Sequence, residues 1–369
     1  MRIGVPKEIK NHEYRVGMTP ASVSELVARG HQAIVETGAG AGIDFSDADY
    51  VAAGATIAPN AAELFSAADM IVKVKEPQPQ EIALLARRHL LFTYLHLAAD
   101  KPQALGLMQS GATCIAYETV TSPTRSLPLL KPMSEVAGRM SIQVGAHYLE
   151  KEQGGRGILL GGVPGVAPAR VAILGGGVAG INAAMMAVGL RADVTIYDVN
   201  ADRLAELDLH FGSQIKTAYA SRAAIAAAVR GAHLVIGAVL VPGAAAPKLV
   251  TREMLGTMKR GSVVVDIAID QGGCFETSHP TTHSNPVFEV DGVIHYCVAN
   301  MPGAVARTST FALNNATLPF ILKLAEQGAQ AAMAADPHLA AGLNVMDGTI
   351  RHKAVADALA LPFTPASPA

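Results

Sequence analysis

Short apolar runs alternate with alanine-rich runs of helical length through most of this 369-residue chain. The runs that resemble strands are residues 2–6, 32–37, 70–76, 89–96, 112–119, 170–175, 193–198, 233–239, 262–269 and 293–300. Such alternation is typical of parallel sheets, because a parallel connection is long enough to hold a helix. We therefore predict an α/β protein with largely parallel sheets flanked by helices.

A helical stretch at about 134–152 and the glycine- and proline-rich segment QGGRGILLGGVPGVAPAR separate two sets of strands. At roughly 150 residues per domain, the chain length favours two domains. From Thr308 to about Gln327 and beyond the pattern is helical, with no further obvious strand, so we expect the chain to return to the first domain. The predicted domains are residues 1–130 plus 305–369, which form a discontinuous unit, and residues 131–304, which include the connecting helix.

Composition excludes several classes of protein. Half of the residues are hydrophobic and only 16% are charged, which is apolar for a soluble chain and indicates buried contacts between subunits. Charges interrupt the apolar runs before the roughly 20 residues that a spanning helix needs. The start MRIGVPKEIK lacks the apolar core of a signal peptide. We expect a cytoplasmic protein that does not associate with a membrane.

Net charge and cysteine content favour a small-molecule ligand. The formal net charge is -2 and the chain has no basic run, so nucleic acid is not an expected partner. The three cysteines lie far apart and are odd in number, which indicates neither a disulfide framework nor a cysteine-rich zinc site. We expect reduced thiols and no bound metal.

The segment RVAILGGGVAGINAAMMAVGLRADVTIYD has a GxGxxG pattern directly after an apolar strand and at the start of an alanine-rich helix. In such a turn Gly175 permits the tight bend, Gly177 lets the backbone approach a pyrophosphate, and Gly180 lets the helix pack closely on the strand. The helix N-terminus supplies amide donors and a positive dipole end for the phosphates. This context predicts a dinucleotide-binding site in the second domain.

Asp198 ends the next strand, at the distance expected for a carboxylate that binds the ribose. It would accept a hydrogen bond from the 2′-hydroxyl of NAD and repel the 2′-phosphate of NADP, so NAD is the expected cofactor. Arg203 follows shortly after and keeps the NADP alternative open, because arginine can bind that phosphate.

Residues that follow the other strands of the second domain are also candidates, since ligands of open α/β sheets bind at the carboxyl ends of the strands. They are Val239, Leu240, Ile267, Asp270, Asn300 and Met301. Asp270 is the most informative, because its carboxylate comes directly after the apolar run 263–269. The alternative that Asp270 is a helix N-cap or a turn residue stays open.

In the first domain, Arg15, Lys75 and His96 form a set suited to an organic acid. Arginine binds a carboxylate bidentately, lysine polarises a carbonyl or imine, and histidine exchanges a proton near neutral pH. Taken singly, each has a more ordinary explanation as a surface arginine, a solvated lysine or a histidine bonded to backbone. In DMIVKVKEP, strand alternation places Ile71, Lys73 and Lys75 on one face, and such a face is usually solvated.

Nine stretches in one order, from Met1 to about Thr317, resemble alanine dehydrogenase. They are MRIGVPKEIKNHEYRVGMTP, GAGAGIDFSDADY, KVKEP, LFTYLHLAA, PMSEVAGRM, GGVPGV, VIGAVLVPGAAAPKLV, VVVDIAIDQGGCFE and YCVANMPGAVARTST. The resemblance implies two Rossmann-like domains, the first for the substrate and the second for NAD, in a hexamer. It also implies reversible oxidative deamination of L-alanine to pyruvate and ammonium. Glyoxylate or a slightly larger 2-oxo acid stays open as an alternative substrate.

The resemblance also assigns roles to residues. Arg15 and Lys75 correspond to substrate-binding positions, and His96 and Asp270 to catalytic ones. The residues at cofactor-contacting positions are Ser134, Asp198, Arg203, Ile267, Asn300 and Met301. We expect His96 to exchange the proton of the pyruvate oxygen, and Asp270 to stabilise the cationic imine and ammonium or to activate water. This division stays open, because either group can handle protons.

One departure and two alternative functions accompany the resemblance. Ala220 stands where many relatives have a serine near the adenine. The NAD-binding component of proton-translocating transhydrogenase shares the RVGMTP-like start and APKLVTREM, but it typically lacks equivalents of Lys75, His96 and Asp270. A non-catalytic NAD sensor would not need these residues, which argues against that alternative.

Overall fold

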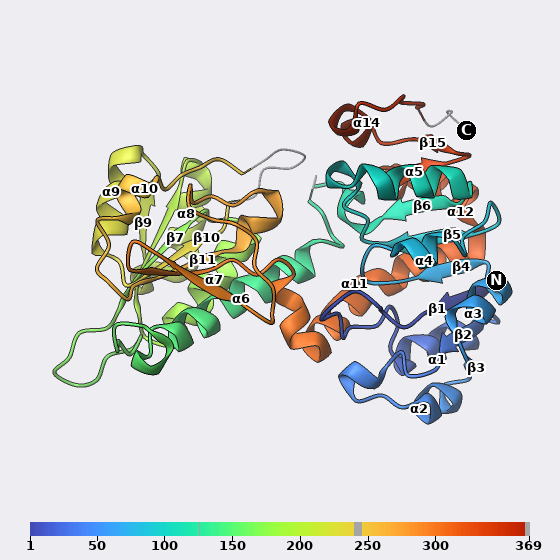
Figure 1. Ribbon diagram of the computed structural model, residues 1–369, viewed down its shortest axis with the longest axis horizontal. Helices are drawn as coiled ribbons and strands as arrows, with labels where there is room; N and C mark the ends of the chain where they lie inside the picture. Colours follow the sequence, from blue (N-terminus) through green and yellow to red (C-terminus); the bar gives the residue numbers. More distant parts are fainter. Residues whose placement is uncertain (125, 240–245, 366–369) are drawn as a thin grey trace. The chain divides into compact units, whose positions relative to one another are not determined.

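The computed structural model describes residues 1–124, 126–239 and 246–365 of the chain. The chain divides into two compact units, which are Met1–Met133 with Val305–Ala369 (unit 1) and Ser134–Ala304 (unit 2). Each unit is built around one sheet with helices packed on it (Figure 1). The expected fold class, two domains with largely parallel sheets flanked by helices, is confirmed.

The sheet of unit 1 has eight strands among the described residues, in the order β15-β14-β6-β5-β4-β1-β2-β3. They are β1 (Arg2–Val5), β2 (Gln32–Glu36), β3 (Thr56–Ala58), β4 (Met70–Val72), β5 (Leu90–Thr93), β6 (Thr113–Ala116), β14 (Leu343–Met346) and β15 (Thr349–Ile350). Strands β1 to β6 pair in parallel in the doubly wound order 3-2-1-4-5-6. The strand order reverses between β1 and β4, so a ligand of unit 1 is expected beyond the carboxyl ends of these two strands.

Helices of unit 1 begin at local capping signals. Thr19 caps the first helix by accepting a hydrogen bond from the Ser22 amide, and Pro20 is its first residue. The helices are α1 (Pro20–Ala28), α2 (Asp47–Ala52), α3 (Ala61–Ala67), α4 (Pro79–Ile82), α5 (Lys101–Ser110), α11 (Ala306–Gln327), α12 (Ala329–Ala335), α13 (Pro337–Ala340) and α14 (Lys353–Leu359). Short 3-10 turns are η1 (Ala41–Ile43), η2 (Leu97–Ala99) and η3 (Tyr117–Thr119). Asn314 ties α11 to the start of α1, because its Oδ1 accepts from the amide and the hydroxyl of Thr19, both at 3.0 Å.

The sheet of unit 2 repeats this topology. Its seven strands among the described residues have the order β12-β13-β11-β10-β7-β8-β9. They are β7 (Arg170–Leu174), β8 (Asp193–Asp198), β9 (Lys216–Tyr219), β10 (Leu234–Gly237), β11 (Val263–Asp266), β12 (Val287–Val290) and β13 (Val293–Tyr296). Without the antiparallel β12, the strands are parallel and again follow the order 3-2-1-4-5-6, with the reversal between β7 and β10.

The helices of unit 2 follow the parallel strands. They are α7 (Val178–Gly189), α8 (Ala201–Phe211), α9 (Arg222–Gly231) and α10 (Arg252–Leu255), with the 3-10 turns η4 (Lys151–Gln153), η5 (Gly212–Gln214) and η6 (Ile267–Gln271). The long helix α6 (Lys131–Tyr148) and the turn η7 (Met301–Val305) lie where the chain passes between the units. Within the described parts of the chain, no helix is both long enough and apolar enough to cross a membrane.

All ten predicted strand runs contain a strand, but five strands were missed. The expectation that no strand follows residue 308 is wrong, because β14 and β15 extend the sheet of unit 1 antiparallel to β6 and to each other. β14–β15 and β12–β13 are hairpins closed by the two-residue turns Asp347–Gly348 and Asp291–Gly292, with positive φ at all four residues. Asp-Gly between strand-like residues is a recognised hairpin signal. The alternation of strands and helices in the sequence does not reveal these hairpins, because no helix connects their strands.

Strand β13 carries a fully buried histidine, His295. Its Nδ1 lies 3.0 Å from the carbonyl oxygen of Val293, which can only accept, so Nδ1 carries the proton and Nε2 accepts from the Thr277 hydroxyl at 2.8 Å. The ring also stacks on Phe288. Burial disfavours the charged imidazolium and lowers the pKa of His295 from 6.5 to about 4.

The burial of a neutral His295 predicts that the folded protein loses stability as the pH falls. Below pH 6.5 the unfolded chain binds a proton that folded His295 does not bind until about pH 4, so stability falls as the pH falls through this window. Each pH unit costs about 1.4 kcal/mol. We expect the denaturant midpoint to drop between about pH 7 and about pH 5, and to drop less for His295→Gln. His279→Gln, which removes an exposed histidine stacked on the same Phe288 ring, should keep the wild-type dependence; equal slopes in all three proteins would contradict the assignment.

Candidate active site

The three predicted substrate residues of unit 1 follow three neighbouring parallel strands. Arg15 lies in the connection from β1 to α1, Lys75 follows β4, and His96 follows β5. These strands lie side by side in the order β5-β4-β1, and the last two flank the point where the strand order reverses. The topology therefore brings the three residues to the same edge of the sheet, where ligands of such folds bind.

Arg15 is buried, with 2% of the residue exposed, and it is held by Glu13. Its Nε and Nη2 each donate to a different oxygen of the Glu13 carboxylate at 2.6 Å, and its Nη1 lies 3.1 Å from Sδ of Met133. Burial lowers and Glu13 raises the pKa of Arg15, with the net shift upward, so the guanidinium is firmly charged. Glu13 thus occupies the Nε–Nη2 edge of the guanidinium and fixes the orientation of this planar group.

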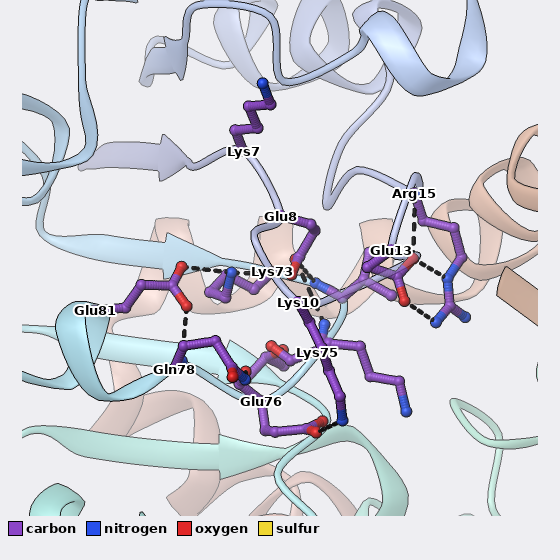
Figure 2. A network of polar contacts seen from close by, with 12 residues as sticks. Lys7, Glu8, Lys10, Glu13, Arg15, Lys73, Lys75, Glu76, Gln78 and Glu81 are labelled. Atoms are coloured by element: carbon purple, nitrogen blue, oxygen red, sulfur yellow. Dashed lines mark hydrogen bonds and ion pairs between the residues drawn. The ribbon is translucent and has the colours of Figure 1, made fainter. Parts of the chain in front are cut away.

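Lys73 and Lys75 do not form the solvated face that strand alternation suggests. Strand β4 ends at Val72, and both lysines are buried, with 1% and 9% of the residue exposed. The ammonium of Lys73 pairs with Glu8 and Glu81 (Figure 2). Among the described residues, by contrast, the Lys75 ammonium makes no hydrogen bond or ion pair in the structure. A mostly buried lysine whose ammonium has no described protein partner is suited to binding an acceptor on a ligand.

His96 is exposed and held in an unusual backbone conformation, with φ 51° and ψ 35°. Glu118 stabilises this turn, because its carboxylate accepts from the amides of Leu95 and His96, the second at 2.6 Å. The imidazole stacks on Tyr94 at 5.7 Å between ring centroids. Burial raises the pKa of Tyr94, and the positive charge of the nearby Arg15 offsets only part of this rise. Positive φ in a residue other than glycine is often retained at functional sites.

The glycine turn of unit 2 has the geometry that the motif predicts. Gly175 has φ 103°, and a Cβ there would meet the carbonyl oxygen of Ala238 at 2.8 Å, at the end of the neighbouring β10. Gly180 has no room at all, since a Cβ would lie 1.9 Å from the carbonyl oxygen of Gly175. At Gly177, the N-cap of α7, a Cβ would meet nothing within 4 Å among the described residues. The turn is thus tight on the protein side and open at the helix N-terminus, which fits a pyrophosphate.

Asp198, at the end of β8, and Arg203 both attach to this turn. The carboxylate of Asp198 accepts from the amides of Gly176 at 2.7 Å and Asn200 at 2.9 Å. Arg203 donates from Nε to the carbonyl oxygen of Gly176 at 2.6 Å and pairs with Glu206. The Asp198 carboxylate at this turn, together with the pairing of Arg203 with Glu206, disfavours a 2′-phosphate here.

The other predicted cofactor residues also lie at the carboxyl ends of strands. Val239 follows β10 beside Gly175, Ile267 and exposed Asp270 lie in η6 directly after β11, and Asn300 and Met301 follow β13. Asp270 is thus in a 3-10 turn, and buried Asp266 begins that turn by accepting from the Ala268 amide. Leu240 lies outside the described residues.

Ser134 and Ala220 complete the set. Ser134 is in α6, one turn before Gly138, where a Cβ would lie 2.2 Å from the carbonyl oxygen of Ala179 near the start of α7. Ala220 donates its amide to the carbonyl oxygen of Asp198 at 2.9 Å. Both residues are therefore near the glycine turn, and a serine at position 220 could keep the same backbone bond. Within the part of the chain that is described, no three His, Cys, Asp or Glu side chains form a group that could hold a metal ion.

Sequence reasoning missed the carboxylates that support the site. Glu13 orients Arg15, Glu118 holds the His96 turn, and Glu8 and Glu81 bind Lys73. A signal for Glu13 was its place two residues before Arg15. The others approach from distant parts of the chain, so spacing gives no indication of them.

Comparison with known proteins gives a consistent result over the whole chain. The family model for the N-terminal domain of alanine dehydrogenase/PNT matches residues 4–137, and that for the C-terminal domain matches residues 141–353. A curated alanine dehydrogenase from Halomonas elongata is 62% identical, with 100% of this chain and 99% of that protein covered.

Solved structures resemble the chain to different degrees. A structure of L-alanine dehydrogenase superimposes with a TM-score of 0.94 at 56% identity, covering 98% of this chain and 99% of the other. A structure described as transhydrogenase from Sinorhizobium meliloti has a TM-score of 0.81 at 28% identity, covering 96% and 100%.

The glycine turn gives a matched pair of variants. Gly180→Ala forces a Cβ against the carbonyl oxygen of Gly175, so we expect about 1–3 kcal/mol of destabilisation from overpacking and weaker dinucleotide binding. Gly177→Ala meets no described protein atom, so it should keep the thermal midpoint and yet weaken binding about tenfold, because the methyl group stands where a phosphate approaches. Thermal unfolding and fluorescence titration with NADH measure the two effects. Wild-type affinity in both variants would show that this turn does not hold the dinucleotide.

Proposed function

This chain belongs to the alanine dehydrogenase/PNT family, and from its full-length relatives we infer that it catalyses the reversible, NAD-dependent oxidative deamination of L-alanine to pyruvate and ammonium. The observation that carries this conclusion is 62% identity to an alanine dehydrogenase over the whole chain. The solved transhydrogenase is 28% identical, so a hydride-relay module is not favoured. A mere NAD sensor is not favoured either.

The residues of the glycine turn suit the cofactor. The open space at Gly177 and the amides at the start of α7 would hold the pyrophosphate, and Asp198 would accept from the ribose hydroxyls. NAD, when bound, takes up the hydride that leaves the α-carbon of alanine. The protein binds and orients both molecules and keeps water away from the reacting atoms.

Arg15 and Lys75 provide the positive charges that bind the substrate acid in this proposal. Glu13 accepts from Nε and Nη2 of Arg15 and so orients the guanidinium that would bind the substrate carboxylate. Lys75 would donate to the carbonyl oxygen or the imine end of the substrate. This assignment of Lys75 is supported by the contrast with Lys73, whose ammonium is already paired with two carboxylates.

His96 and Asp270 would move and stabilise protons. His96 donates a proton to the pyruvate oxygen as ammonia adds, and accepts it again in the direction of deamination. Asp270 stabilises the cationic imine and the ammonium by its negative charge. The exposure of both side chains, at the carboxyl ends of β5 and β11, supports these assignments.

Replacing Lys75 tests the substrate assignment. We expect Lys75→Ala to lower kcat/KM for pyruvate by roughly a hundredfold or more, because a charged donor to the reacting carbonyl is lost, and to leave NADH binding unchanged. The assay follows the absorbance of NADH with pyruvate and ammonium. Glyoxylate and NADPH serve as comparators, since one methylene changes selectivity by only about 1–3 kcal/mol.

Lys7→Ala is the matched control. Lys7 is exposed and points away from the Lys75 network in Figure 2, so this variant should retain wild-type kinetics. If Lys75→Ala turned over pyruvate as fast as the wild type, the proposed role of Lys75 would be wrong.

The hexamer implied by the resemblance is also part of this proposal, as is the cytoplasmic location. Its physical support is the number of apolar side chains that remain exposed in one chain, such as Leu159, Val163 and Val166 on a loop of unit 2, each more than half exposed. Contiguous exposed apolar residues often mark contacts between subunits. We expect sedimentation equilibrium to give six times the 38.2 kDa chain mass; a monomer at micromolar concentration would contradict the hexamer.

A further inference from the structure

A buried group of charges, formed by Lys73, Glu8 and Glu81, contacts the chain next to Lys75. The ammonium of Lys73 is 3.0 Å from Oε2 of Glu8 and 2.7 Å from Oε1 of Glu81. All three side chains are nearly inaccessible, with at most 3% exposed. Removing three charges from water is costly, and mutual pairing only offsets that cost. A group of this kind is therefore weak evidence for stability alone and calls for another role.

The two carboxylates of this group contact different parts of the chain. Glu81, in α4, pairs with Lys73 and accepts from the Gln78 amide at 2.8 Å, within its own helix start. Glu8 instead reaches across from the segment after β1 to the segment after β4. Its Oε2 binds the Lys73 ammonium, and its Oε1 accepts from the amides of Val74 at 2.6 Å and Lys75 at 3.4 Å. One carboxylate thus contacts three successive residues (Figure 2).

Glu8 binds the backbone amides that follow strand β4, whereas the carbonyl oxygens of Val74 and Lys75 still accept from the Tyr94 amide at 3.3 Å and the Thr93 hydroxyl at 3.0 Å. Strand β4 stops at Val72, and although the Lys73 amide still donates to the carbonyl oxygen of Phe92, those of Val74 and Lys75 turn to Glu8. A side-chain carboxylate that accepts from backbone amides forms a strong, charge-assisted bond. Glu8 therefore holds the amide side of the backbone at Val74 and Lys75, whereas the Lys75 ammonium, at the end of its flexible stem, has no partner among the described residues.

We propose that Glu8 is a positioning residue for substrate binding, which fixes the backbone of residues 73–75 so that the Lys75 ammonium is presented to the 2-oxo acid. The inference rests on the proposed role of Lys75. A lysine side chain is long and flexible, so the position of its backbone limits where its ammonium can reach. Glu81 anchors the same buried group without contacting residues 74 and 75, and is the natural comparison.

The test measures pyruvate binding apart from turnover. The enzyme–NADH complex is titrated with pyruvate in the absence of ammonium, NADH fluorescence reports the dissociation constant, and thermal unfolding is recorded for each variant. We expect Glu8→Ala to weaken pyruvate binding about tenfold with unchanged NADH affinity. Glu8→Gln should recover part of this loss, because its amide oxygen can still accept from the amides of Val74 and Lys75. Glu81→Gln should lower the thermal midpoint and leave pyruvate affinity near that of the wild type.

A double-mutant cycle with Lys75→Ala separates positioning from stability. If Glu8 acts through Lys75, adding Glu8→Gln to Lys75→Ala changes pyruvate affinity no further, whereas a general structural effect adds to it. Additive losses, or equal losses in Glu8→Gln and Glu81→Gln, would overturn the inference. If Lys75→Ala itself binds pyruvate normally, the proposed function of Lys75 fails first. If only the Glu8 variants bind normally, the positioning role fails alone.

Discussion

Parallel strands place the carboxyl ends of a whole sheet on one edge, and both units of this chain depend on that constraint. In each sheet the strands follow the order 3-2-1-4-5-6, so two connections diverge at the reversal and leave space for a ligand. In unit 1 the diverging segments carry Glu8 and Arg15 on one side and Lys73 and Lys75 on the other. In unit 2 they carry the glycine turn and Val239. In our proposal the same topology serves an organic acid in unit 1 and a dinucleotide in unit 2, because different residues follow the strands.

The cationic side chains at this edge of unit 1 differ in the protein partners that they have. Arg15 has its carboxylate partner in Glu13, and Lys73 has two. A buried charge with carboxylate partners holds the surrounding backbone in one arrangement. Lys73, between two carboxylates, is neutralised within the protein, whereas the Lys75 ammonium has no described partner. In our proposal the network therefore leaves Lys75, together with the oriented guanidinium of Arg15, to bind the ligand.

Prediction from sequence succeeded where a local pattern has one physical cause. The ten helix-linked strand runs and the roles of Gly175 and Gly180 follow from local periodicity and from steric limits of the backbone. The edge hairpins were missed because two-residue Asp-Gly turns, and not helices, connect their strands. The burial of Lys73 could not be predicted, since Glu8 and Glu81 reach it from other segments. Alternation also suggested the wrong environment for Lys75, because Glu8 and β5 bond the backbone that follows Val72 and the residue is buried.

The short antiparallel hairpins have a consequence for assembly. One edge of each sheet ends in a hairpin strand, β15 or β12, of two or four residues, and the opposite edges are β3 and β9, of three and four. Edges this short offer few backbone groups to another chain. Copies of the protein therefore have little opportunity to join by continuing a sheet. Self-association would have to use side chains on the surfaces of helices and loops. Contacts of that kind depend on individual residues and carry little risk of open-ended stacking of strands.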